Sequence, residues 1–104
     1  MRRYDIYLPL NYNNGKPIPA TKITAICDEL AETFGALTVS PLSAPYRGRW
    51  KYGGVEYVDQ IVKVEILTSD DKVTKKYLKD FKHRLKKDLK QIDILITTHG
   101  IQVI

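Results

Sequence analysis

The stretch YRGRWKYGGVEYVDQ, residues 46–60, decides how this chain is built. Charged and aromatic residues alternate along RGRWKY, as they do in an extended strand, and Gly53-Gly54 then permits the positive φ values of a tight reversal. The segment VEYVDQ then returns beside the first arm, with Val55, Tyr57 and Asp59 on one side of the strand. The stretch therefore predicts a two-stranded hairpin in which aromatic side chains pair across the strands.

An amphipathic helix precedes this hairpin in the chain. Apolar residues recur at three- and four-residue spacing between Ile23 and Phe34, which places them on one helical face. Pro19 suits a helix entrance and Gly35 suits a C-terminal stop. Cys27 belongs to the apolar stripe, so we interpret it as a core residue rather than a reactive thiol.

A second and longer helix follows the hairpin. Asp70 and Asp71 supply an N-cap candidate and negative charge at its start. The pattern also predicts a favourable pair between Asp80 and Arg84, four residues apart. One apolar stripe is expected, made of Val73, Tyr77, Leu78, Phe81, Leu85 and Leu89.

The remaining segments predict strands at residues 3–8, 36–40, 55–67 and 92–98, with the tail 101–104 free to continue pairing. The order is strand, helix, strand, strand, helix, strand. This order indicates an α+β, ferredoxin-like split β-α-β fold (βαββαβ) that forms a single domain over residues 1–104. Its antiparallel sheet carries both helices on one face, which leaves the other face to water, a partner or a ligand.

The residues expected on that open face are too polar for a core and too apolar for plain solvent. They are Asp5, Tyr7, Tyr57, Asp59, Ile61, Lys63, Glu65, Leu95 and Thr97. Half-covered sheets of this kind often pair with another subunit, and pairing would hide Tyr7, Ile61 and Leu95. We therefore predict a homodimer that forms through the open sheet face.

The amino-acid composition limits the classes of protein to which this chain can belong. A hydrophobic fraction of 43% over 104 residues predicts a small folded domain rather than a disordered chain. The single Cys27 implies no disulfide framework, and no apolar run reaches the length of a membrane span. The apolar run at the start is too short for a secretory signal, so a cytoplasmic protein is expected.

The hairpin also offers a candidate ligand site. Trp50 and Tyr57 would form a flat apolar wall, and Asp59 would act as an acid or base. Arg47 and Arg49 would hold an anionic group. The alternative is a purely structural hairpin, because one sequence does not fix the relative geometry of these side chains.

His99 follows the last strand and is the other titratable candidate, either as an acid or base or as a strand-end residue bonded to backbone. The two His and one Cys lack the spacing of metal ligands, so no metal site is predicted. The sequence contains no phosphate-binding loop, and no cofactor is predicted. An enzyme of the dimeric α/β-barrel kind would combine Trp50, Tyr57, Asp59 and His99 in one pocket. A small homo-oligomeric interaction or ligand-binding module is the favoured hypothesis.

The net charge of +5 is concentrated in the second helix. Residues 72–90 carry eight Lys and one Arg against two Asp, a balance of +7, whereas the rest of the chain balances to −2. A nucleic-acid-binding face is the alternative function, and it would use Lys72, Lys75, Lys76, Lys79, Lys86, Lys87 and Lys90. A simple solvated helix face is the competing interpretation, because no aromatic residue for base stacking lies among these lysines.

Four segments together resemble a family of small, uncharacterised bacterial proteins. They are the opening YDIYLPLNYNNGKPI, the strand FGALTV, the segment GRWKYGGVEYVDQ and the ending IDILITTHGIQVI. The matching positions include Trp50, Tyr57, Asp59 and His99, while Ala36 stands where the family pattern has a second Gly. The resemblance implies a stand-alone protein of ferredoxin-like fold with no established activity, and it carries over no catalytic residue.

Overall fold

The computed structural model describes residues 1–104 and shows an α+β fold with a five-stranded antiparallel sheet and two helices. In chain order the elements are β1 (Arg2–Pro9), α1 (Ala20–Phe34), β2 (Thr38–Val39), β3 (Tyr46–Tyr52), β4 (Val55–Thr68), α2 (Lys72–Asp88) and β5 (Ile96–Gly100). Neither helix is long and apolar enough to cross a membrane.

The sheet is organised around β1 and the long strand β4. β1 lies between β4 and β5, and both β2 and β3 pair with the other edge of β4. Asp5 stands opposite Glu65 on one side and Thr97 on the other. Because side chains alternate along a strand, this register fixes which residues of the three strands share a face.

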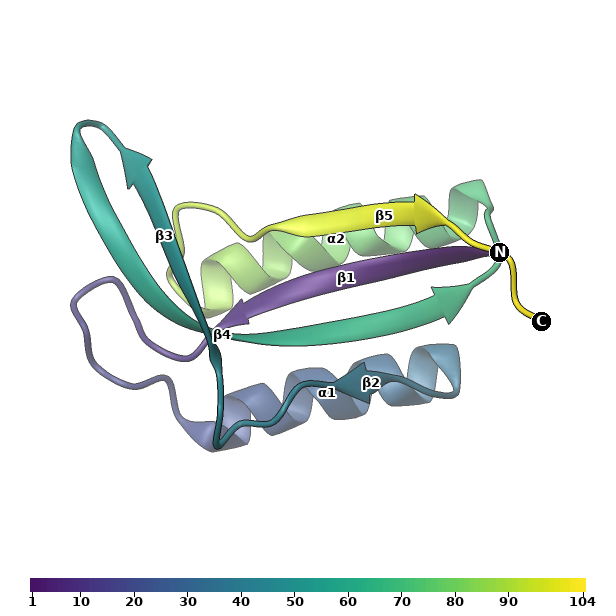
Figure 1. Ribbon diagram of the computed structural model, residues 1–104, viewed down its shortest axis with the longest axis horizontal. Helices are drawn as coiled ribbons and strands as arrows, with labels where there is room; N and C mark the ends of the chain where they lie inside the picture. Colours follow the sequence, from purple (N-terminus) through teal and green to yellow (C-terminus); the bar gives the residue numbers. More distant parts are fainter.

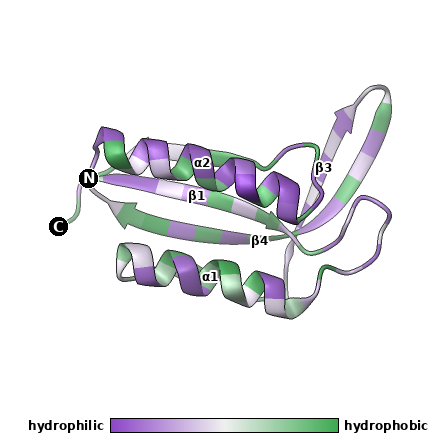
Figure 2. Cartoon of the chain, turned by 180° about the vertical axis from the view of Figure 1, so that it is seen from behind, coloured by the Kyte–Doolittle hydropathy of each residue, from purple (hydrophilic) through white to green (hydrophobic).

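Both helices cover the same face of the sheet (Figures 1 and 2), as the alternation predicts. Val62, Val64 and Ile66 of β4 are fully buried beneath them, next to Ile6 and Leu8 of β1. The remaining core residues are Tyr4, Ile18, Ile23, Leu30, Leu78, Phe81, Leu85, Leu89 and Ile94. The opposite face, seen in front in Figure 1, carries no helix and is called the open face below.

The predicted hairpin is confirmed. β3 and the beginning of β4 pair around Gly53-Gly54, whose φ angles of 59° and 80° are both positive. This ribbon, residues 46–60, bends away from the rest of the sheet and projects beyond the body of the molecule (Figure 1). We call it the arm. Two strands with no helix behind them bury little surface of their own, so the arm adds a surface rather than a core.

The helix ends follow the predicted signals. The Asp71 side chain caps α2 by accepting a hydrogen bond of 2.7 Å from the Thr74 N–H. Gly35 ends α1 in the left-handed conformation, and its N–H donates to the Ala31 carbonyl. Cys27 is half-buried and packs against the core, and this burial raises the pKa of its thiol.

Two details predicted for α2 are wrong. Val73 is 79% exposed, whereas Thr74 is buried, because Thr74 and not Val73 lies one turn before Leu78 on the face that meets the sheet. Asp80 pairs with Lys76 rather than with Arg84. Arg84 instead makes two hydrogen bonds to the Glu29 carboxylate on α1, a bidentate geometry that a neighbour on its own helix does not offer.

The last strand begins four residues later than predicted. Lys90 ends the helix with a positive φ of 51°, and residues 92–95 carry the chain back to the sheet. Ile94 is buried in the core, but regular pairing with β1 starts only at Ile96. The tail 101–104 forms no strand, and only the Ile101 N–H reaches the Met1 carbonyl.

Candidate functional site

The open face holds two groups of side chains that lie along β1. One surrounds Tyr7 and Pro9 at the base of the arm, and the other surrounds Asp5 near the opposite end of the sheet. We call the first the arm pocket and the second the Asp5 cluster. Because residues 3, 5, 7 and 9 of one strand point the same way, the two groups are neighbours on one surface.

The arm pocket has a volume of about 340 Å³ and lies where the arm leaves the sheet. Its walls come from β1, the arm, β4 and the segment that precedes β5. The lining residues are Tyr7, Pro9, Gly48, Arg49, Trp50, Asp59, Ile61, Gln91, Asp93, Ile94 and Leu95. A volume of this size lies at the lower end of the range for small-molecule sites, about 300–1,000 Å³.

Trp50 and Asp59 form the polar centre of this pocket. The Trp50 indole N–H donates a hydrogen bond of 2.7 Å to Oδ2 of Asp59, and the Asp59 side chain is nearly buried. The indole ring also stacks on Tyr57, with ring centroids 4.5 Å apart and planes 19° from parallel. Stacking and hydrogen bonding together hold the indole in one orientation, and one oxygen of the Asp59 carboxylate has no protein donor.

Gly48 has a steric role at this site. A Cβ atom at this position would clash with the Cδ1 atom of Ile61, which points across the face toward β3. The missing side chain therefore makes room for Ile61 and lets the pocket floor close against the arm. The sequence pattern alone assigned Gly48 no such function.

The structure brings together only part of the predicted ligand site. Trp50, Asp59 and Arg49 line the pocket, and the Tyr57 ring stacks on the Trp50 indole. The Arg49 guanidinium is engaged with Glu56 on the other face of the arm, at 2.8 Å. Arg47 is exposed on that same charged face and does not line the arm pocket. The two arginines are therefore not placed to hold an anion in the arm pocket.

Eight of the eleven pocket residues were not predicted as ligand contacts, among them Tyr7, Asp93 and Leu95. Tyr7 and Leu95 were expected on the open face, and their backbone bond, from the Tyr7 N–H to the Leu95 carbonyl, joins the two sides of the pocket. Asp93 had no sequence signal, because it sits in the crossing that was predicted as strand. Burial acts to raise the pKa of Asp93, but hydrogen bonds from Lys82 and the Ile94 N–H lower it below the ordinary value.

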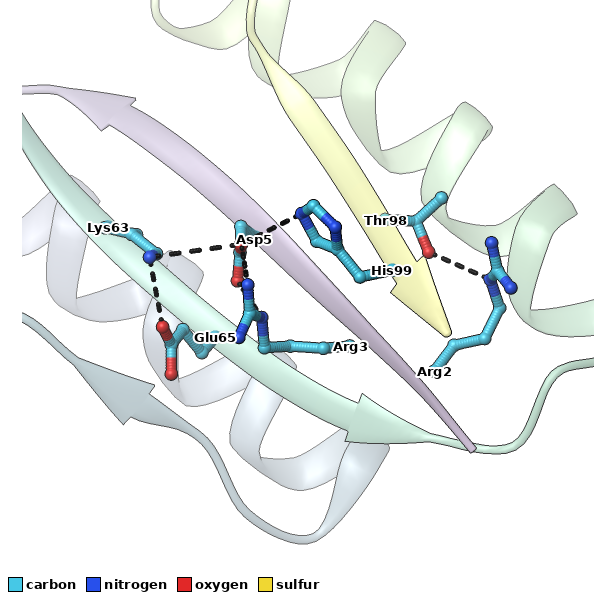
Figure 3. A network of polar contacts seen from close by, with 7 residues as sticks. All are labelled: Arg2, Arg3, Asp5, Lys63, Glu65, Thr98 and His99. Carbon is cyan, nitrogen blue, oxygen red and sulfur yellow. Dashed lines mark hydrogen bonds and ion pairs between the residues drawn. The ribbon is translucent and has the colours of Figure 1, made fainter. Parts of the chain in front are cut away.

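The Asp5 cluster contains His99 (Figure 3). Asp5 is buried, with only 2% of its side chain exposed, although it belongs to the open face. Arg3 lies over it, with Nε 3.1 Å from Oδ1 and a hydrogen bond of 3.2 Å from Nη2 to Oδ2. Lys63 and His99 approach Oδ2 at 3.9 Å and 3.8 Å from β4 and β5.

Charges in this cluster nearly cancel. Lys63 also pairs with Glu65 at 3.1 Å, and this hydrogen bond is the main reason that the pKa of Lys63 is raised. The cluster thus holds two carboxylates against Arg3 and Lys63, with His99 at its exposed margin. Asp5 Oδ1 has only the ion pair with Arg3 Nε and accepts no hydrogen bond, and the buried hydroxyl of neighbouring Thr97 has no hydrogen-bond partner. Both atoms are buried and therefore out of reach of an external ligand.

His99 and Asp59 share the open face but not a site. His99 belongs to the Asp5 cluster and does not line the arm pocket. No group of three His, Cys, Asp or Glu side chains is arranged to hold a metal ion. The chemistry available in the arm pocket is therefore a carboxylate, an indole and an aromatic wall.

Six of the seven lysines of the predicted face are exposed, and Figure 2 shows that the side of α2 turned away from the sheet is largely hydrophilic. Lys75 and Lys76 lie within 4 Å of Asp70 and Asp80, respectively, and Lys86 lies 3.9 Å from Asp93. The four lysines without a carboxylate partner are Lys72, Lys79, Lys87 and Lys90. Carboxylates neutralise part of this face, and the remaining positive charge is spread along the helix.

The fold, but not the sequence, has recognisable relatives. No protein-family model matches the chain, and a search of curated proteins also gives no match. A phage SAM lyase solved in its apo state is similar with a TM-score of 0.69 and 13% identity, over 94% of this chain and 78% of that one. A phage SAM lyase in complex with S-methyl-5′-thioadenosine gives a TM-score of 0.67 and 14% identity, over 95% and 80%. At such identities the likeness concerns the fold alone.

Proposed function

We propose that this protein is a homo-oligomeric, small-molecule-binding protein whose ligand occupies the arm pocket. The observation that carries the proposal is the Trp50–Asp59 pair, a nearly buried carboxylate oriented by an indole inside a concavity of about 340 Å³. Concave sites with aromatic walls and a few oriented polar groups are the usual form of ligand pockets. A hairpin with only a structural role would not require a nearly buried carboxylate at its base.

The pocket chemistry favours a flat ligand that donates hydrogen bonds or carries positive charge. Asp59 contributes a carboxylate with no cationic partner, Asp93 contributes one that is paired with Lys82, and the Arg49 guanidinium is turned away toward Glu56. Tyr7 and Trp50 add aromatic surface, which attracts planar rings and cations. An anionic ligand held by Arg47 and Arg49, as the sequence suggested, has less support.

A thioether nucleoside is the first probe to use. The similar phage SAM lyase was solved with S-methyl-5′-thioadenosine, whose flat base and amino group match the pocket chemistry described above. The likeness supports the choice of probe, and the pocket residues support the proposal. Adenosine without the sulfur substituent is the matched comparison ligand.

Trp50 gives a direct assay, because it is the only tryptophan in the chain. We expect S-methyl-5′-thioadenosine to change its fluorescence in a saturable titration. Asp59→Asn keeps an acceptor for the indole but removes the charge, so it should weaken binding about ten- to a hundredfold, as loss of a charge-assisted hydrogen bond does. Asp80→Asn, on the outer face of α2, is the control and should bind like the wild type.

Two results would count against the ligand proposal. The first is the absence of any saturable fluorescence change for both nucleosides at millimolar concentration. The second is equal binding by the Asp59→Asn and Asp80→Asn variants, because the carboxylate in the pocket would then contribute nothing.

The homo-oligomeric part of the proposal rests on the open face. Leu95 is exposed at the edge of the pocket, and Tyr7 and Ile61 are only partly covered. Leu95→Glu should split the assembly, and light scattering would detect the change in mass. Resemblance to small stand-alone bacterial proteins is compatible with this role, and we propose the fold as a ferredoxin-like variant whose second strand is divided into β2 and β3.

Nucleic-acid binding through α2 is the second candidate. It is supported by the four lysines on the outer helix face that lie near no carboxylate. Such binding should weaken linearly on a plot of log affinity against log salt. A combined Lys79→Gln and Lys87→Gln variant should reduce that slope. A mobility assay at low salt that shows no complex would remove this candidate.

An enzyme is the third candidate, and it would use Asp59 as the acid or base. Such an enzyme would act on the ligand bound beside Trp50. If His99 were the acid or base, the substrate would have to bind at the Asp5 cluster rather than in the arm pocket. Turnover of S-methyl-5′-thioadenosine that is abolished in Asp59→Asn would support this candidate, and binding without turnover would leave only the binding function.

A further inference from the structure

The arm has one apolar face and one polar face, although neither face packs against the hydrophobic core. The face that continues the open sheet face is aromatic and aliphatic and comprises Tyr46, Trp50, Tyr52, Val55, Tyr57 and Ile61. The reverse face is polar and comprises Arg47, Arg49, Lys51, Glu56, Val58 and Gln60. The Trp50–Tyr57 stack and the Arg49–Glu56 ion pair confirm that these two sets lie on opposite sides.

Much of the aromatic face is uncovered. Tyr46 and Tyr52 are 55% and 60% exposed, and Val55 is also more than half exposed, because the outer part of the arm projects beyond the body (Figure 1). A ribbon of two strands is marginal in water unless one face packs against another element. A polar reverse face with an aromatic front is the pattern of a strand pair that is buried on one side.

We propose that the aromatic face of the arm is the contact surface for a second copy of this chain, which it meets on the open sheet face beside the pocket. This inference rests on the proposed function, since it names the element through which the oligomer forms. The same arm supplies Gly48 and Trp50 to the pocket, so assembly and ligand binding would be linked.

The charge distribution favours a second copy on this face. The Asp5 cluster balances Arg3 and Lys63 against Asp5 and Glu65, so two open faces can approach without strong repulsion. The opposite side of the molecule carries α2, where residues 72–90 hold a balance of +7 and would repel an identical helix. Like-with-like association is thus favoured at the open face and disfavoured between two copies of α2.

The available area is also sufficient. An aromatic side chain buries about 150–250 Å² when fully covered, so each half-exposed Tyr leaves about 100 Å² to cover. Tyr46, Tyr52, Val55 and Leu95 together offer roughly 400 Å² per copy, or about 800 Å² in a symmetric pair. The partly exposed pocket rim brings the total to about 1,000 Å², the lower bound for a specific interface.

Val55 and Val58 provide a matched test. Both are 52% exposed and lie on the same strand, but they point to opposite faces of the arm. Val55→Lys should reduce the mass measured by sedimentation equilibrium to that of a single chain, whereas Val58→Lys should keep the wild-type assembly. Tyr52→Lys is a second variant of the aromatic face and should behave like Val55→Lys. Circular dichroism would verify that each variant is folded.

The outcomes separate the arm from the rest of the proposal. If Val55→Lys and Tyr52→Lys both keep the wild-type mass while Leu95→Glu becomes a single chain, the arm assignment is overturned and the open-face oligomer stands. If the wild type is a single chain even at high concentration, both the arm assignment and the oligomer fall. The fluorescence titration tests the ligand pocket independently in either case.

Discussion

Replacing Asp5 by Asn should destabilise the fold more than any other single charge change on the open face. The Asp5 carboxylate is buried, and its two oxygens face the Arg3 guanidinium and the Lys63 ammonium. Asn has nearly the same shape, so the substitution removes the negative charge without creating a cavity. It also turns an amide toward cations that need acceptors.

The magnitude follows from the burial of the partners. Removing one member of a fully buried ion pair costs about 3–5 kcal/mol. Here Arg3 and Lys63 keep about a third and a quarter of their side-chain surface exposed, so water offsets part of the loss. We therefore expect a loss of about 2–3 kcal/mol in the free energy of unfolding, which for about 100 residues lowers the Tm by roughly 10–20 °C.

Urea denaturation monitored by the fluorescence of Trp50 would measure this loss at pH 7. Glu65→Gln is the matched control, because Glu65 pairs with the same Lys63 at 3.1 Å but is one-third exposed. The control should cost less than about 1 kcal/mol. Equal costs for Asp5→Asn and Glu65→Gln would refute the reasoning, since burial of the carboxylate would then make no difference.

Three further changes test local features. Asp71→Ala removes the cap of α2 and should cost about 1 kcal/mol in thermal or urea unfolding; no loss would mean that water replaces the cap. The Arg84 hydrogen bonds lower the pKa of Glu29 below its ordinary value of 4.5, so this pair stabilises the fold above that pH and is lost as pH falls through the lowered pKa. Urea midpoints at pH 6 and pH 3 should therefore differ less in Glu29→Gln than in the wild type, and an equal difference would contradict this. Gly48→Ala pushes Ile61 into the pocket, costing about 1 kcal/mol and weakening ligand titration several-fold; adding Ile61→Val, which lacks Cδ1, should restore binding.

Much of the fold could be predicted because its signals are local. Gly53-Gly54 between two strand-like segments determines the arm, and the spacing of apolar residues determines both helices. Asp71 and Gly35 mark helix ends by mechanisms that involve only neighbouring residues.

Two of the wrong predictions involved partners distant in sequence. Arg84 was assigned to Asp80 on its own helix, but Glu29, 55 residues away, offers a better carboxylate geometry. The start of β5 depends on where β1 runs, and the apolar residues 92–95 alone do not reveal this. The pattern in residues 92–98 is the same for a regular strand and for a crossing that buries Ile94.

In the candidate site, too, features with local signals could be predicted and features that depend on distant residues could not. The arm pattern brought Trp50, Tyr57 and Asp59 into consideration, because cross-strand pairs can be counted from the turn. The sequence did not reveal that both arginines turn away from the pocket, with Arg49 held on the reverse face by Glu56. The separation of His99 from Asp59 depends on strand order, which places β5 next to β1 and away from the arm.

The Trp50 indole N–H resonance tests the central claim most directly. It is the only indole N–H in the chain, and it donates to Asp59 at the centre of the pocket. When S-methyl-5′-thioadenosine is added to ¹⁵N-labelled protein, this resonance should shift together with the amides of Tyr7, Gly48 and Leu95. A fixed indole resonance, with shifts confined to the amides of α2, would contradict the account.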